Sequence, residues 1–155
     1  MKKLLYIFFI IILLLNLTAC NNIKTFKEKK NHKNYYTDLL STDIKSQNKY
    51  LITLLDTNFY KKVTMDKAEC DLIKKSMLAL NNDNFIDKPK DIPNKALYKI
   101  YFTFKNHKFV AEIYNKKYMC LYPWDGSYEK DYINMDSLPA AYNLFEFCKS
   151  IIPRD

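Results

Sequence analysis

Residues 98–113 read YKIYFTFKNHKFVAEI, two runs of alternating apolar and polar residues separated by a polar turn. Side chains along a strand point alternately to opposite faces, so the isoleucine and phenylalanines of the first run share one face and Tyr101 lies on the other. A two-residue turn at Asn106-His107 would bring the apolar faces of both runs together, which predicts an antiparallel hairpin. The expected pairs across it are Phe104 with Phe109, Phe102 with Ala111 and Ile100 with Ile113.

The connection after this hairpin, Asn115-Lys116-Lys117, decides which side chains of the next strand face the core. A three-residue loop turns Met119 and Leu121 inward, whereas a two-residue loop turns them outward. We favour three residues because Met119 then continues the apolar layer of the hairpin. The loop length also decides the direction of Tyr118, Cys120 and Tyr122, which face away from the core in this interpretation.

Helical segments flank the strands. Asp66 followed by Glu69 is typical of a capping box, and apolar positions at helical spacing continue to about Leu80. Asp136-Ser137-Leu138-Pro139 resembles the start of a second helix, with its apolar stripe reaching Ile152. Residues 35–40 could form a short helical turn.

The remaining segments favour strands. Residues 50–65 (YLITLLDTNFYKKVTM) are rich in β-branched and aromatic residues, and they break at Asp56-Thr57-Asn58 into two strands or one bent strand. A short strand is expected around Tyr132-Ile133-Asn134-Met135, after the turn that holds the only glycine, Gly126.

The order β-α-β-β-β-β-α predicts an α+β fold, with an antiparallel sheet of about five or six strands and two helices on one face. This order is similar to the TATA-box-binding-protein-like topology, which implies a curved sheet whose other face stays open. A resemblance of element order implies no shared activity, because one fold serves many functions.

The amino-terminal segment has the layout of a secretory signal peptide, with Lys2 and Lys3 followed by the apolar run Leu4–Leu15. That run is shorter than the roughly 20 residues that span a bilayer. The next residues, Leu17-Thr18-Ala19-Cys20, resemble the lipobox of bacterial lipoproteins. We therefore expect a signal peptide at 1–19, a lipidated polar tether at 20–34 and a single α+β domain at 35–155.

The lipobox resemblance implies that the Cys20 thiol carries a diacylglycerol thioether, which anchors the chain in the cell membrane on its extracytoplasmic face. Two acyl chains give stable anchoring, whereas one chain binds only marginally. In size and in its Lys-, Asn- and Tyr-rich composition the chain also resembles small, uncharacterised lipoproteins of clostridia and related low-GC Gram-positive bacteria.

Composition excludes several classes of protein. A single Gly in 155 residues excludes Gly-rich nucleotide-binding loops, and 48% apolar residues argue against wholesale disorder. The formal charge is +8, of which the leader lysines contribute two, but the lysines are scattered along the chain. A scattered charge on an exported protein does not predict nucleic-acid binding.

Metal, cofactor and thiol chemistry have weak support. Cys70, Cys120 and Cys148 show no CxxC spacing, and they could form one disulfide with one free thiol or remain three thiols. His32 and His107 lie in the expected tether and turn, away from any second ligand, so we expect no zinc site, no catalytic cysteine and no cofactor.

Four carboxylates lie close together in sequence around Trp124. They do not have the spacing of a calcium-binding loop, and no second motif selects an acid/base pair among them. Turn solvation and helix capping explain them better than a hydrolytic site does. The four are Asp125, Glu129, Asp131 and Asp136.

Tyrosine is the most unusual feature of the composition, with 13 in the chain. Tyr and Trp concentrate in binding interfaces, because they combine an apolar body with a polar tip. We expect a non-catalytic domain that binds an envelope protein or peptide; a wall polysaccharide is the alternative, and a hydrolase is the third hypothesis. The candidate binding residues, on the sheet face away from the helices, are Tyr101, Tyr114, Tyr118, Tyr122 and Trp124.

Overall fold

The computed structural model describes residues 30–47, 49–126 and 128–153. The strands are β1 (Leu51–Asp56), β2 (Lys62–Thr64), β3 (Phe85–Ile86), β4 (Tyr98–Thr103), β5 (Lys108–Ile113), β6 (Tyr118–Pro123) and β7 (Asp131–Asn134). The helices are α2 (Tyr35–Ser46), α3 (Lys67–Leu78) and α4 (Leu144–Ile151), with short 3-10 turns η2 (Asn82–Asn84) and η3 (Ala140–Tyr142).

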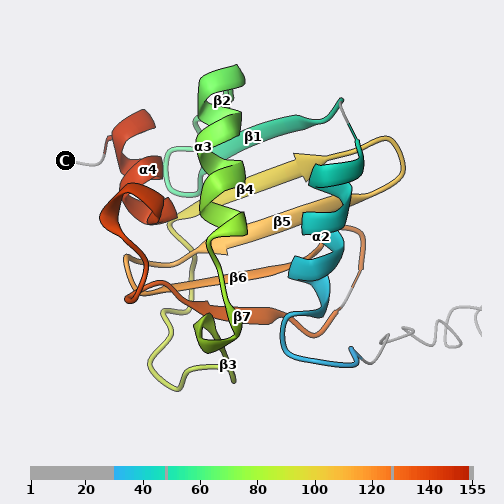
Figure 1. Cartoon of the computed structure of the whole chain (residues 1–155). Coiled ribbons are helices and arrows are strands. Elements are labelled where there is room, and N and C mark those ends of the chain that lie inside the picture. The colour runs from blue at the N-terminus through green and yellow to red at the C-terminus, as the bar shows by residue number, and fades with distance from the viewer. Residues whose placement is uncertain (1–29, 48, 127, 154–155) are drawn as a thin grey trace, which may run out of the picture.

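The seven strands form one antiparallel sheet in the order β2-β1-β4-β5-β6-β7-β3, and the three α-helices lie together on one of its faces (Figure 1). The predicted α+β class and antiparallel sheet are confirmed. The described residues hold one more α-helix than the prediction, and β3 was not foreseen. The similarity to the TATA-box-binding-protein-like topology stays a prediction.

The central hairpin forms with the predicted faces but a different register. Ile100 pairs with Ala111 and Phe102 with Phe109, so each partner is displaced by two residues from the expected one. The turn is centred one residue earlier, and the Phe104 N–H donates to the His107 carbonyl at 2.9 Å. Because the displacement is even, no side chain changes face.

Two contacts with residues outside the hairpin accompany this register. The Phe104 ring lies beside the Tyr50 ring, with centroids 5.2 Å apart, at the end of the core. His107 Nδ1 lies 2.9 Å from Asp43 Oδ2 of α2. Neither partner is close in sequence to the hairpin, so the alternation within residues 98–113 carries no sign of them.

The next connection confirms the three-residue loop. Ile113 pairs with Met119 across β5 and β6, and the Tyr114 N–H donates to the Tyr118 carbonyl at 3.0 Å, which leaves Asn115–Lys117 as the loop. The Asn115 Oδ1 accepts from the Lys117 and Tyr118 N–H groups, both at 2.8 Å. The Asn side chain thus closes the turn without a glycine.

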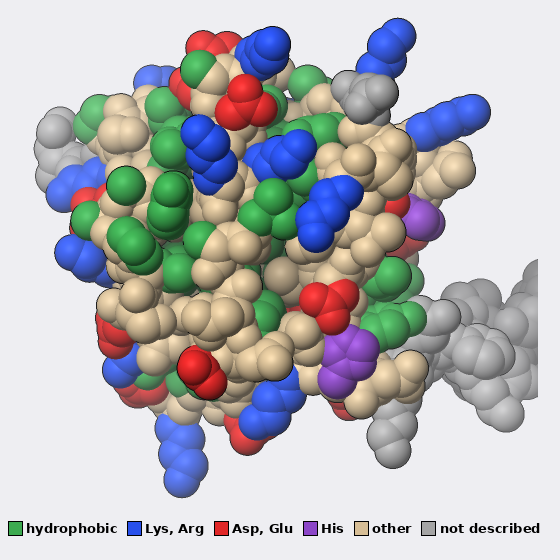
Figure 2. Space-filling view, viewed as in Figure 1, with side chains coloured by type: hydrophobic (Ala, Val, Ile, Leu, Met, Phe, Trp, Pro, Cys, Tyr) green, Lys and Arg blue, Asp and Glu red, His purple; other side chains and the backbone are tan. Residues whose placement is uncertain are grey.

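The core lies between the helices and the apolar face of the sheet. Leu40 of α2, Ile73 of α3 and Cys148 of α4 are fully buried there. The sheet supplies the facing layer, which comprises Ile52, Leu54, Ile100, Phe102, Ala111, Ile113, Met119 and Leu121. This side of the sheet is therefore closed to ligands by its own helices (Figure 2).

Helix α2 is longer than the short helical turn predicted at residues 35–40. It runs for 12 residues, and the carboxylate of Asp131, which is buried and far away in the sequence, bonds to its first turn. Asp131 Oδ2 accepts from the Thr37 N–H at 2.8 Å and from Thr37 Oγ1 at 3.0 Å. A contact between residues so far apart in sequence explains why the local pattern predicts too short a helix.

The last helix begins later than predicted. Residues 136–139 do not start it; η3 intervenes, and α4 begins at Leu144. The cap is Asn143, whose Oδ1 accepts from the Phe145 N–H at 3.1 Å and whose Nδ2 donates to the Lys116 carbonyl at 2.9 Å. The same side chain therefore caps α4 and ties it to the β5–β6 loop.

Within the described residues no helix has both the length and the apolar character that crossing a bilayer requires. The predicted leader and lipobox, including Cys20, lie outside these residues.

The capping box at the start of α3 is confirmed and provides a test of the fold. Asp66 Oδ1 accepts from the Glu69 N–H, and Glu69 Oε2 accepts from the Asp66 N–H, both at 2.8 Å. We expect Asp66→Ala to lower the free energy of unfolding by about 1 kcal/mol in urea titrations, and Asp66→Asn to lower it less. Asp71→Ala, an exposed position of the same helix, is the control. Equal losses in Asp66→Ala and Asp71→Ala would contradict the assignment.

Candidate functional site

The sheet face opposite the helices carries a row of polar side chains across its centre. Lys99 of β4 pairs directly with Glu112 of β5, which pairs with Cys120 of β6. These residues alternate with core residues along each strand, so the register that builds the core also sets this row side by side. We call this surface the outer face.

Glu112 is the centre of the row. Only 7% of the residue is exposed, yet both of its carboxylate oxygens are paired. Lys99 Nζ lies 2.8 Å from Oε1, and Lys130 Nζ lies 2.6 Å from Oε2. Tyr114 donates its hydroxyl to the same Oε2 at 2.9 Å, and the Cys120 thiol lies 3.6 Å from it. A buried charge is tolerated only with such partners.

The lysines decide the ionisation of this carboxylate. Burial by itself would raise the pKa of Glu112, but hydrogen bonds and charges from Lys130 and Lys99 outweigh burial and hold the pKa at about 2. Burial raises the pKa of the neighbouring Cys120 thiol to about 12, so that thiol stays protonated and unreactive at neutral pH. The row is thus an ionic site, not a nucleophilic one.

A loop closes one half of the outer face. Residues 87–97, between β3 and β4, cross over it, and Ile92 and Ala96 pack against Tyr114 and Tyr118 in a small second apolar cluster. The Tyr118 hydroxyl donates to Asp91 Oδ1 of this loop at 3.1 Å. At the end of β1, Thr57 Oγ1 donates to the Ala96 carbonyl at 2.6 Å. The loop is therefore bonded to the sheet at both sides.

The predicted aromatic surface is divided by this loop. All five candidate residues project from the outer face or its margin, but the rings of Tyr114 and Tyr118 are buried beneath the loop. Tyr101 and Tyr122 are half-buried, and Trp124 is 53% exposed. The accessible part of the predicted surface is thus reduced to Tyr101, Tyr122 and Trp124.

Lysines accompany the accessible rings. Lys108 Nζ lies 4.0 Å from the Trp124 ring centroid and 5.2 Å from that of Tyr101, and Lys130 Nζ lies 4.4 Å from that of Tyr122. Cations over aromatic faces are attracted by the ring electrons.

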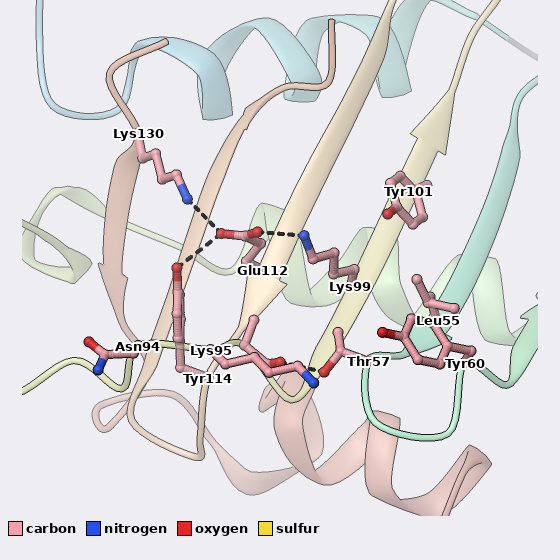
Figure 3. A pocket seen from close by; sticks show the side chains of 11 residues that line it. Leu55, Thr57, Tyr60, Asn94, Lys95, Lys99, Tyr101, Glu112, Tyr114 and Lys130 are labelled. Atoms are coloured by element: carbon pink, nitrogen blue, oxygen red, sulfur yellow. Dashed lines mark hydrogen bonds and ion pairs between the residues drawn. The ribbon is translucent and has the colours of Figure 1, made fainter. Parts of the chain in front are cut away.

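The open half of the outer face is hollowed beside Glu112 into a pocket of about 420 Å³ (Figure 3). It lies at the junction of β1, β4, β5 and the loop 87–97. Its charged lining comprises Lys95, Lys99, Lys130 and Glu112, and its aromatic lining comprises Tyr60, Tyr101 and Tyr114. We call it the lysine pocket.

The four predicted carboxylates do not assemble into a site. Asp131 is fully buried and is occupied by Thr37 and by Lys30 at 3.4 Å, while Asp125, Glu129 and Asp136 are exposed. In the described part of the chain, no group of three or more His, Cys, Asp or Glu side chains is arranged to hold a metal ion.

The three cysteines of the described residues are free thiols. Cys120 and Cys148 are buried, and burial raises the pKa of both. Cys70 is half-buried in the first turn of α3, and its pKa is raised mainly by burial and then by Asp66. Of the alternatives left open by sequence, the structure favours three thiols.

Sequence reasoning missed the lysine pocket. The alternation of 98–113 does place Lys99 and Glu112 on the face of Tyr101, and the corrected register pairs them directly. The sequence thus indicates that Lys99 and Glu112 share this face, although the prediction of a binding surface uses only the tyrosines. Lys95 and Lys130 come from loops, so no strand pattern locates them.

The comparisons with known proteins identify the family. A family model described as "Domain of unknown function (DUF4883)" matches residues 30–148. This chain belongs to that family. Its fold is similar to a crystal structure described as "Putative Lipoprotein from Clostridium perfringens", with 33% sequence identity and a TM-score of 0.72. The similarity covers 81% of this chain and 100% of that one. No curated protein matches the chain.

The ion pairs of Glu112 predict a specific acid sensitivity. In the unfolded chain this carboxyl takes up a proton near its ordinary pKa of 4.5, whereas in the folded protein it stays ionised to about pH 2. Its contribution to stability is therefore complete above about pH 4.5 and is lost as the pH falls towards 2.

Urea unfolding of wild type and Glu112→Gln at several pH values tests this. Wild type should lose more free energy of unfolding between pH 5 and pH 2 than Glu112→Gln does. Glu146→Gln, which removes a half-exposed carboxylate 3.4 Å from Lys116, should follow wild type. An identical acid dependence in wild type and Glu112→Gln would show that the lysines do not hold the carboxylate ionised.

Proposed function

We propose that this protein is a lipoprotein, anchored by Cys20 at the extracytoplasmic face of the cell membrane, whose outer face binds a protein or peptide of the envelope without catalysis. The anchoring half of the proposal is supported by the Leu17-Thr18-Ala19-Cys20 motif and by the similarity to the Clostridium perfringens protein. Export also argues against a nucleic-acid partner.

The end of the tether supports a position close to the bilayer. Lys30, inside the expected tether, already donates to the Lys130 carbonyl at 2.7 Å and contacts Asp131. Nine residues, 21–29, separate this contact from Cys20. Ten Cα–Cα steps therefore lead from Cys20 to Lys30, and an extended chain of that length spans at most about 35 Å. The binding face would therefore work within a short distance of the membrane.

The observation that carries the binding half is the exposed aromatic and basic margin of the outer face. Trp124 and Tyr60 are 53% and 77% exposed, on a surface that no helix of the described residues covers. Tyr and Trp are enriched in protein interfaces relative to the rest of the surface. On the same face the thiol of Cys120 is buried and unreactive, and the carboxylates are dispersed. The described residues of this face therefore provide no nucleophile and no acid/base pair.

A wall polysaccharide is the alternative ligand. Its support is the same exposed Trp124, because aromatic rings also stack on the apolar faces of sugars. One side of that ring is already occupied by the ammonium of Lys108, 4.0 Å away. The ring and the ammonium together offer an apolar and a charged contact, which a protein or peptide can match, and we therefore prefer that class of ligand.

Lipidation is tested by metabolic labelling with radioactive palmitate. Wild type should be labelled and sediment with membranes, whereas Cys20→Ser should carry no label, because the thioether needs the thiol. Cys70→Ser, which removes a thiol of the folded domain, should be labelled like wild type. Label on Cys20→Ser, or an unlabelled wild-type chain, would refute the anchor.

The binding face is tested by placing a photo-crosslinking amino acid at Tyr101 or Trp124 in living cells. We expect both positions to give the same protein adduct, identified by mass spectrometry, because they share one surface. Position Lys75, exposed on α3 on the opposite face, is the control. The proposal fails if the adduct forms at Lys75 and not at the other two positions, or if none of the three gives a protein adduct.

A further inference from the structure

We infer that the lysine pocket receives the carboxylate of an acidic side chain, so that the partner presents an acidic peptide segment to the outer face. This inference rests on the proposed function and names the chemistry of its ligand.

The pocket has an excess of positive charge. Three ammonium groups, those of Lys95, Lys99 and Lys130, line it against the single carboxylate of Glu112. The Lys95 ammonium contacts only a neutral group in the described residues, donating to Asn58 Oδ1 at 3.0 Å. One carboxylate cannot neutralise three cations, so the pocket attracts an anion.

Two of the cations are held in place before any ligand arrives. Lys99 and Lys130 are fixed on either side of Glu112, and Figure 3 shows both side chains converging on it. Their side chains are 31% and 28% exposed, so neither is fully buried, and both line the pocket. An ammonium has three donors, and the pair with Glu112 uses one. Ordering these side chains in advance lowers the entropic cost of binding.

Aromatic rings extend the site towards Trp124. Tyr101 lines the pocket, and Lys108 lies over both Tyr101 and Trp124, at 5.2 and 4.0 Å from their ring centroids. Lysines and rings therefore alternate along the surface. A peptide that places an apolar residue beside its acidic residue would match this pattern, and a volume of about 420 Å³ suits one or two side chains.

A phosphate group fits the pocket less well. Phosphate sites commonly use helix N-termini or the bidentate fork of Arg. The α-helices of the described residues lie on the other face of the sheet, and the cations of the pocket are all lysines. Lysine provides a point charge, which pairs with a carboxylate or a phosphate, so inorganic phosphate is included among the probes.

The only tryptophan of the chain lies on this surface, so its fluorescence reports binding directly. We would titrate the full-length chain, in a non-ionic detergent at 0.1 M salt, with acetyl-Gly-Glu-Leu-Glu-Gly-amide. The matched probe replaces both Glu by Gln. Polygalacturonate, a polysaccharide that carries carboxylates, and inorganic phosphate complete the set. We expect the acidic peptide alone to give a saturable change.

Charge variants then locate the site. Lys95→Gln, at an exposed position outside the Glu112 pairs, should weaken binding of the acidic peptide about two- to fivefold, the range measured for one exposed ion pair. Lys95→Glu should weaken it further. Lys75→Gln and Lys75→Glu on α3 are the matched controls and should bind like wild type. Glu112→Gln should bind the acidic peptide more tightly, because it removes the carboxylate that competes for the lysines. If that variant does not fold, the two Lys95 variants still test the inference.

Several results would overturn the inference. Equal binding of the Gln peptide, no response to any probe, or equal losses in the Lys95 and Lys75 variants would show that the pocket does not select a carboxylate. Binding of polygalacturonate or phosphate without the peptide would assign the pocket to another ligand class. If crosslinking at Tyr101 and Trp124 still captures one protein, the proposed function stands and only the acidic ligand fails. If crosslinking gives no such adduct, both the proposed function and the acidic ligand are refuted.

Discussion

The pairing of β4 with β5 is the constraint on which both surfaces of the sheet depend. Since neighbouring side chains of a strand point to opposite faces, the register that sets Ile100 beside Ala111 in the core also sets Lys99 beside Glu112 outside it. A slip by one residue would bury the charged pair under the helices and expose the core residues. Burial of the apolar face therefore fixes the position of the ionic row.

The outer face combines a buried cluster of ion pairs with an exposed basic and aromatic surface. Glu112 is buried and tolerated only because Lys99 and Lys130 pair with it, and removing a partner from a buried charge is far more costly than losing an exposed ion pair. The loop 87–97 covers the rings of Tyr114 and Tyr118 next to it. What remains open is a basic and aromatic surface, where binding depends on side chains that the fold already holds in position.

The errors of prediction have a common cause. The hairpin faces and the three-residue loop at Asn115 were predictable because they follow from periodicity within a few residues. The hairpin register and the length of α2 were not predictable in this way, and both involve residues that are far apart in sequence: His107 contacts Asp43, and Asp131 bonds Thr37. Local sequence patterns carry no information on contacts between residues that are far apart in the chain.

The amino-acid sequence by itself determined the α+β class, the side of the sheet on which the residues of the central hairpin and of the strand after Asn115 lie, and the capping box at Asp66, because each follows from short-range geometry. It also supplies the motif ending at Cys20, which folding of the domain does not alter. Only the tertiary structure decided that a loop hides half of the tyrosine face, that Lys130 pairs with Glu112, and that Lys95 lines the same pocket. Lys95 and Lys130 come from separate loops, and their positions are fixed by how the loops pack across the sheet, which no spacing along the chain encodes.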